Sequence, residues 1–171
     1  MDIGFIAIFL CEGVLIIFGF YLIWSWINQT PFYPSKTKPL TDLLKELNLS
    51  GNLNFIDIGS GDGRIVLWAA KQGFNADGIE FNPFLSLYSR SIITLKGLRS
   101  RAKIFNKDFR NHDFAKYDLA YLYIFPEHMD NVSEKLFTQM KKGSVVVTNT
   151  FKFTKIQPDR TFGRYYIYYV K

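Results

Sequence analysis

The chain has 171 residues and a formal net charge of +6, a length that fits one domain with an appendage. Its single cysteine, Cys11, excludes a disulfide framework and a cysteine-based zinc site within one chain. The charge suits an anionic membrane surface or an acidic partner but does not by itself argue for nucleic acid, so we expect no nucleic-acid partner.

Residues 3–27 are almost wholly apolar. A helix of about twenty such residues crosses a bilayer core of roughly 30 Å, and Tyr21, Trp24 and Trp26 stand where an interfacial aromatic belt belongs. A cleaved signal peptide is the competing interpretation, but it needs a basic start and a shorter apolar core. We therefore predict a retained, single-pass transmembrane helix that contacts the lipid bilayer through residues 3–27.

The charges beside this run predict its orientation. No Lys or Arg precedes it, whereas Lys36, Lys38 and Lys45 follow it. The positive-inside rule then places the C-terminal part on the cytoplasmic side, which is the matrix side if the protein is mitochondrial. We divide the chain into an anchor at 1–28, a linker and leading helix at 29–52, and a globular domain at 53–171.

The globular part alternates strand and helix patterns. Leucines at helical spacing mark one face of a leading helix, from Leu40 to Leu47. We expect strands at residues 53–58, 75–80, 102–105, 118–125, 144–149 and 163–170, and helices at 63–71, 83–96 and 127–142. This alternation predicts an α/β fold with a doubly wound, mostly parallel, Rossmann-like sheet.

A glycine-rich turn follows the first of these strands, in the run Phe-Ile-Asp-Ile-Gly-Ser-Gly-Asp-Gly-Arg at 55–64. Glycines let the backbone approach a ligand and tolerate the turn angles. Asp57 precedes the first glycine, and Glu80 lies about twenty residues further on, where the second strand should end. An acid that ends a buried strand needs a partner, which favours a functional role for Asp57 over a simple cap.

The spacing narrows the choice of adenosine cofactor. The nicotinamide fingerprint is Gly-x-Gly-x-x-Gly, and here the third glycine, Gly63, comes one residue early. No Gly-x-x-x-x-Gly-Lys-Ser/Thr run exists, which excludes a phosphate-binding loop of that type.

The pattern Asp-x-Gly-x-Gly-x-Gly, with acids at Glu80 and Asp108, resembles class I S-adenosylmethionine-dependent methyltransferases. The resemblance implies that the glycine turn lies under the methionine part of S-adenosyl-L-methionine. It also implies that Glu80 binds the ribose hydroxyls and that Asp108 with Phe109 faces the adenine. The implied cofactor-binding residues are Asp57, Gly59, Ser60, Gly61, Asp62, Glu80, Phe81, Asn82, Asp108 and Phe109.

Further segments of the sequence point to one subgroup of these methyltransferases. Pro-Phe-Tyr-Pro-Ser at 31–35, Gly-Ile-Glu-Phe-Asn-Pro-Phe-Leu at 78–85, Phe-Asn-Lys-Asp at 105–108 and Pro-x-x-Met at 126–129 come in order. Together they look like the small protein-lysine methyltransferases that act on the ATP-synthase c-subunit and the adenine-nucleotide translocase, and like the archaeal broad-specificity lysine methyltransferase. The chain departs from the mitochondrial members at Asp-Phe-Arg, 108–110, where they tend to have Asp-Leu-Trp.

The resemblance implies a membrane-anchored methyltransferase that N-methylates lysine side chains of a protein substrate, itself membrane-associated. Two alternatives stay open: methylation of a small molecule or lipid, and a non-catalytic cofactor-binding module. An apolar wall can hold the cations, and we name Phe32, Tyr33, Phe81 and Phe125 as its candidates. We expect no single indispensable general base and no metal.

Some residues favour structural interpretations. Asn82-Pro83 is interpreted as a helix start, and the tyrosines at 165–169 as core and edge packing. We expect His112 and His128, which lack metal-ligand spacing, at the surface. Asp108 has two interpretations of similar weight, because Lys107 and Arg110 could pair with it outside any cofactor site.

Overall fold

The computed structural model describes residues 3–27, 35, 37–49 and 51–171. The chain divides into two compact units, Met1–Tyr33 and Pro34–Lys171. The predicted wall residues Phe32 and Tyr33 lie outside the described residues.

The described residues of the first unit form one helix, α1 (Ile3–Ile27). Its 25 residues correspond to a length of about 38 Å at 1.5 Å per residue. By length and composition its segment Gly4–Tyr21 could cross a membrane. The predicted helix is therefore present, and its insertion in a bilayer is taken up below as a proposal.

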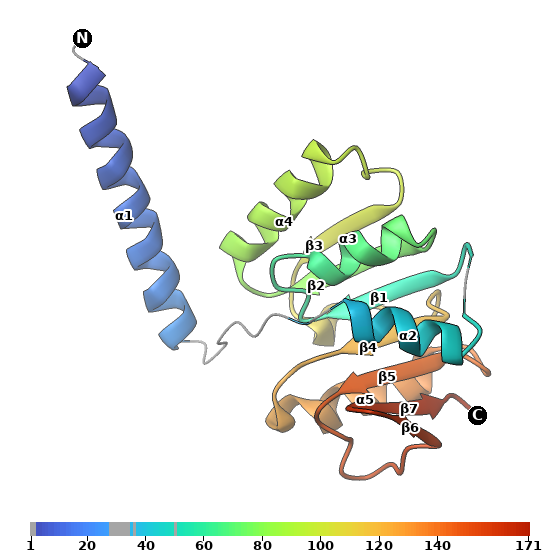
Figure 1. Cartoon of the computed structure of the whole chain (residues 1–171). Helices are drawn as coiled ribbons and strands as arrows, with labels where there is room; N and C mark the ends of the chain where they lie inside the picture. The colour runs from blue at the N-terminus through green and yellow to red at the C-terminus, as the bar shows by residue number, and fades with distance from the viewer. Residues whose placement is uncertain (1–2, 28–34, 36, 50) are drawn as a thin grey trace. The chain divides into compact units, whose positions relative to one another are not determined.

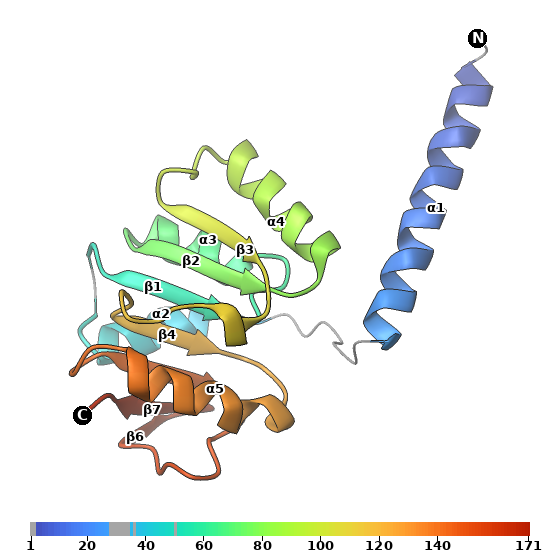
Figure 2. The same ribbon diagram turned by 180° about the vertical axis from the view of Figure 1, so that it is seen from behind.

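The second unit is a sheet with helices on both faces (Figures 1 and 2). The strand order is β3-β2-β1-β4-β5-β7-β6. The strands are β1 (Asn54–Ile58), β2 (Asn75–Glu80), β3 (Ala102–Asn106), β4 (Leu119–Leu122), β5 (Val145–Asn149), β6 (Arg160–Phe162) and β7 (Tyr165–Tyr169). The helices are α2 (Lys38–Glu46), α3 (Arg64–Lys71), α4 (Pro83–Leu95), the short 3-10 helix η1 (Phe109–Asn111) and α5 (Pro126–Gln139).

Two apolar cores cover the sheet. On one face α2, α3 and α4 contribute Leu43, Val66 and Ile93 to a cluster with the sheet. On the other face α5 contributes Val132 and Leu136. The leucines of α2 are among the most buried side chains of the unit, so the leading helix is part of this core.

The sheet is mixed. Strands β1 to β5 run parallel, as predicted, whereas β7 pairs antiparallel with β5 and β6 antiparallel with β7. Strand β6 was not predicted, because its three residues are exposed or half-buried and carry no buried periodicity. Strand β4 ends at Leu122 rather than at the predicted Phe125, because Phe125 is already the cap of α5.

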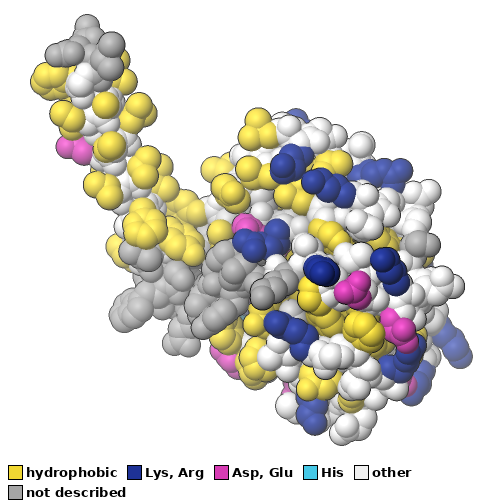
Figure 3. Space-filling view, viewed as in Figure 1, with side chains coloured by type: hydrophobic (Ala, Val, Ile, Leu, Met, Phe, Trp, Pro, Cys, Tyr) yellow, Lys and Arg dark blue, Asp and Glu magenta, His cyan; other side chains and the backbone are white. Residues whose placement is uncertain are grey.

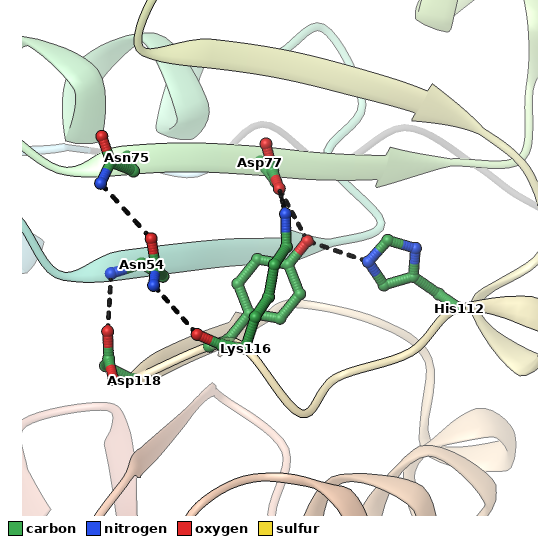
Figure 4. A network of polar contacts seen from close by, with 7 residues as sticks. Asn54, Asn75, Asp77, His112, Lys116 and Asp118 are labelled. Carbon is green, nitrogen blue, oxygen red and sulfur yellow. Dashed lines mark hydrogen bonds and ion pairs between the residues drawn. The ribbon is translucent and has the colours of Figure 1, made fainter.

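A buried polar network joins β2 to the segment after η1 (Figure 4). Asp77 of β2 is 8% exposed. Its carboxylate accepts from the Lys116 ammonium at 2.6 Å and from the Tyr117 hydroxyl at 2.8 Å. The Tyr117 oxygen lies 2.9 Å from His112 Nε2. Because the Tyr117 proton goes to Asp77, His112 donates through Nε2 to the Tyr117 oxygen.

The expected surface position of His112 is wrong. The residue is 6% exposed, stacks on Tyr117 and packs edge-on to Phe114. Desolvation, followed by the charges of Lys107 and Lys116, lowers the pKa of His112 to about 4. The ring is therefore neutral at physiological pH and donates a hydrogen bond from within the core.

The prediction that the tyrosines at 165–169 pack in the core is confirmed for Tyr165 and Tyr168, which are buried.

We expect the buried imidazole to make stability pH-dependent. Its pKa is lower in the folded than in the unfolded chain, so its contribution is present above about pH 6.5. It falls as the pH drops towards 4, where the unfolded chain binds the extra proton. Chemical denaturation between pH 4 and 7 should show this slope in the wild type and a smaller slope in His112→Gln. The control His128→Gln leaves the network intact and should keep the wild-type slope; an unchanged slope in His112→Gln would contradict the assignment.

Candidate active site

The predicted glycine turn lies at the carboxyl end of β1, between β2 and β4. Gly59, Gly61 and Gly63 have φ of 78°, 54° and 78°, in the region that favours glycine. The turn is fixed to the neighbouring strand, because the N–H groups of Gly59 and Ser60 both donate to the Ile79 carbonyl at 2.9 Å.

The space around the turn also requires glycine. A Cβ on Gly59 would lie 2.8 Å from Ile124 Cγ2, and one on Gly63 would lie 2.7 Å from Ser89 Cβ. A Cβ on Gly78 of β2 would lie 2.8 Å from the Ser60 side chain. The turn is thus held between α4 and the segment that follows β4, and it presents backbone where side chains would otherwise block a ligand.

Glu80 ends β2 and bridges two segments. Its Oε2 accepts from Gly61 N–H at 2.7 Å and its Oε1 from Asn82 N–H at 2.7 Å. Burial raises the pKa of this carboxyl, and the backbone donors oppose part of the rise. Each carboxylate oxygen has a second lone pair, so Glu80 can accept further hydroxyl donors without giving up its backbone bonds.

Asp57 lies in the middle of the sheet, in register with Gly78 of β2 and Tyr121 of β4. It is 3% exposed, and among the described residues we find no hydrogen bond or ion pair to its carboxylate. Burial, then the charges of Glu80 and Asp62, raise the pKa of Asp57 well above its ordinary value. A buried carboxyl without a partner is costly, and a cationic ligand would relieve that cost.

Ser60 and Asn82 flank the same region. Asn82 caps α4: its Oδ1 accepts from Phe84 N–H at 2.9 Å and from Leu85 N–H at 3.3 Å, which confirms the predicted helix start. Ser60 Oγ and Asn82 Nδ2 are buried without a partner. Buried polar atoms are normally satisfied, so these two are suited to a polar ligand.

Asp108 pairs with Arg110, which is one of the two interpretations that the sequence left open. Its carboxylate caps η1 through Arg110 N–H and pairs with the Arg110 guanidinium at 2.5 Å. The hydrogen bond from Arg110 lowers the pKa of Asp108. Asp62 likewise pairs with Arg64 at 2.6 Å. Phe109 packs against the ring of His128.

The two described wall candidates lie on either side of the glycine turn. Phe81 follows β2 and is 44% exposed, whereas Phe125 is the half-buried cap of α5, after β4. Since β1 lies between β2 and β4, the two residues flank the end of β1.

Several residues at this edge were not predicted from the sequence. Asn106 of β3 donates to the carbonyls of Glu80 and Phe81 at 2.9 and 3.1 Å and thereby fixes the end of β2. Tyr121 bonds through its hydroxyl to Ser35 Oγ at 3.1 Å and to Asn149 Nδ2 at 2.8 Å. No local pattern predicts a contact between residues 35 and 121.

An open hollow of about 530 Å³ adjoins the turn and is lined by Ser35, Thr37, Lys38, Asp62 and Arg64. Part of the leading segment therefore borders the glycine turn. Taken together, the backbone turn, the bridged Glu80 carboxylate and the unpartnered Asp57, Ser60 and Asn82 fit a ligand with hydroxyl donors and a positive charge.

A profile of the ANTKMT methyltransferase domain matches residues 57–160, which include every predicted cofactor residue. The chain belongs to this family. It is 37% identical to the mouse ATP-synthase c-subunit lysine N-methyltransferase over 78% of this chain and 53% of the mouse protein. It is 27% identical to a protein-lysine N-methyltransferase of Saccharolobus islandicus over 78% of this chain and 84% of that protein.

This member of the ANTKMT family spans about half the length of the mouse relative. Among solved structures it is similar to an RNA methyltransferase from Salinibacter ruber in complex with S-adenosyl-L-homocysteine. The TM-score is 0.73 and the identity 28%, over 81% of this chain and 94% of that chain. A Thiobacillus denitrificans methyltransferase, 18% identical with a TM-score of 0.61, shares the fold. The predicted Rossmann-like methyltransferase fold is thus confirmed.

Replacement of Glu80 tests the cofactor assignment in this family member. In Glu80→Gln an amide NH₂ faces one of two backbone donors and a charged acceptor is lost. Hydrogen bonds to charged groups contribute about 1.5–3 kcal/mol, so affinity for S-adenosyl-L-homocysteine should fall about 10- to 100-fold by calorimetry. Glu46→Gln, at an exposed ion pair with Arg160, should bind like the wild type. Wild-type affinity in a folded Glu80→Gln variant would refute the assignment.

Asp57→Asn should separate stability from binding. The raised pKa means that the Asp57 carboxyl contributes stability only at low pH and loses it as the pH rises through the folded-state value. An amide removes this burden, so the free energy of unfolding at pH 7 should rise by about 1 kcal/mol, while cofactor affinity falls. Asp42→Asn, at an exposed position of α2, should change neither quantity. A destabilised Asp57→Asn variant would show that the carboxylate is satisfied in the free protein.

Proposed function

We propose that this protein is an S-adenosylmethionine-dependent methyltransferase that N-methylates lysine side chains of proteins. The observation that carries the proposal is the buried Glu80 carboxylate, bridged by two backbone N–H groups beside the glycine turn. The lysine N-methyltransferases among its relatives support the choice of acceptor.

The described residues fit S-adenosyl-L-methionine, which supplies an electrophilic methyl group on a sulfonium when it is bound. Glu80 would accept hydrogen bonds from the ribose hydroxyls through its free lone pairs. The glycine turn admits the ligand close to the backbone, and Ser60 Oγ and Asn82 Nδ2 gain partners. Asp57 would stabilise the positive charge of the methionine part, in keeping with its cost in the free protein.

The acceptor lysine must be neutral to attack the methyl group. With an ordinary pKa near 10.4, the neutral amine at pH 7 costs about 4.6 kcal/mol. Phe81 and Phe125 would reduce that cost, because apolar surroundings and a nearby cation both lower the pKa of an amine. Their rings also offer faces to a cation. We assign no general base: the amine loses its proton to water before transfer, and the residues around it align the reactants.

We further propose that α1 anchors the enzyme in a membrane, with residues 34–171 on the cytoplasmic or matrix side. Its length and composition support this, as do the lysines that follow it at 36, 38 and 45. Tethering to the bilayer raises the local concentration of membrane-protein substrates.

Radiolabelled methyl transfer tests the acceptor. The full-length chain is incubated with membrane extract and methyl-labelled S-adenosylmethionine, and protein, lipid and nucleic-acid fractions are counted separately. We expect label in protein, recovered as methyl-lysine after acid hydrolysis, and a loss of most of it with Glu80→Gln. Label mainly in lipid or nucleic acid would assign another acceptor, and no label with intact cofactor binding would indicate a non-catalytic module.

A further inference from the structure

Three large apolar side chains of α4 are exposed, which is unusual for a helix that only covers a sheet. Ser86, Ser89 and Ile93 form its buried face, whereas Leu87, Tyr88 and Leu95 are 64%, 54% and 81% exposed. A surface helix normally buries its large apolar residues and exposes small polar ones. Here two serines are buried and three large apolar residues are exposed, although Phe84, Leu85 and Ile92 are half-buried.

This exposure is confined to one place. Among the described residues from Ser35 to Lys171, the exposed large hydrophobic side chains are Phe81, Leu87, Tyr88 and Leu95, and all lie on α4 or directly before it. At 3.6 residues per turn, residues 87, 88 and 95 fall within an arc of about 100°, the width of one apolar stripe. The polar groups beside them are internally satisfied, because Ser91 Oγ donates to the Leu87 carbonyl and Thr94 Oγ1 to the Arg90 carbonyl. Concentrated exposure of this kind marks an interaction surface.

The charged side chains of α4 and of the segment after it have one sign. From Pro83 to Ala102 there is no Asp or Glu, and four cations follow the stripe or interrupt it: Arg90, Lys96, Arg99 and Arg101. None of these four takes part in a salt bridge with a described residue. Arg90 and Arg101 donate to backbone carbonyls, and Lys96 and Arg99 are exposed. Figure 3 shows Lys and Arg side chains beside the hydrophobic ones over this part of the surface.

We propose that α4 is a second membrane contact, which lies in the plane of an anionic lipid surface with Leu87, Tyr88 and Leu95 in the headgroup region. Leu and aromatic residues beside Lys and Arg are the composition of interfacial helices. The all-positive flank complements anionic lipid and would repel a second copy of itself. The inference rests on the proposed anchoring by α1: only residues 28–37 separate α1 from α2, and ten residues span at most about 35 Å.

The consequence is an orientation of the active site. Asn82, whose side chain caps α4, donates its backbone N–H to Glu80, so α4 begins at the cofactor site. Docking of α4 holds that edge of the sheet near the bilayer surface, where a membrane protein presents a lysine close to the headgroups.

Depth measurement in vesicles tests the contact. Full-length protein with Cys11→Ser carries a fluorophore on Leu95→Cys, or on Glu134→Cys as the control, since Glu134 is exposed on α5, across the sheet. Each is reconstituted in phosphatidylcholine vesicles with and without one-third phosphatidylglycerol, and with lipid-borne nitroxide quenchers. We expect quenching at Leu95 well above that at Glu134, and only with the anionic lipid. Each basic residue near an anionic lipid surface strengthens binding about fivefold, and replacing it with an acid removes at least this gain in affinity. Lys96→Glu with Arg99→Glu should therefore weaken docking at least about 25-fold.

Equal quenching at the two positions, equal quenching with and without anionic lipid, or quenching that depends on the protein-to-lipid ratio would each overturn the proposal. The last would show that a second copy covers α4. Methyl transfer to membrane extract, measured in parallel with the same protein, keeps the two proposals apart: transfer without quenching refutes only the α4 contact, and quenching without transfer refutes only the enzymatic function.

Discussion

The bridge made by Glu80 is the interaction on which the rest of the site depends. One carboxylate oxygen holds Gly61, at the turn after β1, and the other holds Asn82, at the start of α4. The two segments that must surround a ligand are thereby fixed to each other through one side chain at the end of β2. Because the bonds go to backbone N–H groups, they constrain the path of the chain and leave lone pairs for a ligand.

The site is built at a cost to stability. Asp57 and Glu80 are both buried and both have raised pKa values, and the charge of Glu80 adds to the cost of ionising Asp57. The described structure compensates Glu80 with backbone donors but offers Asp57 none. Elsewhere the protein pairs a buried carboxylate: Oδ2 of Asp77 accepts from both Lys116 and Tyr117. The contrast between Asp57 and Asp77, on adjacent strands, supports our proposal that Asp57 faces a ligand whereas Asp77 is structural.

Sequence patterns predicted the elements that depend on local order. The five parallel strands, the cap at Asn82 and the glycine turn follow from periodicity, a helix-start signal and spacing. What they could not predict depends on contacts between distant residues. His112 is buried because it hydrogen-bonds to Tyr117, which in turn donates to Asp77. The Tyr121 hydroxyl bonds to Ser35, 86 positions away in the sequence. Strand β6 exists only because β7 provides its edge. The roles of the cofactor residues and the acceptor wall stay predictions, with Phe32 and Tyr33 outside the described residues.

The glycine turn also explains why α4 has its unusual face. Ser89 Cβ lies so close to Gly63 that a methyl group there would stand 2.7 Å away. An approach this close admits only small side chains on the buried face of α4, and Ser86 and Ser89 supply them. Beside these serines the helix buries Ile93 in the core and half-buries Phe84, Leu85 and Ile92. Leu87, Tyr88 and Leu95 point outward, where burial must come from something other than the sheet. The close approach of α4 to the glycine turn thus goes with an outer face that the sheet does not cover, and the cations of α4 and of the segment after it fit the anionic partner that we propose.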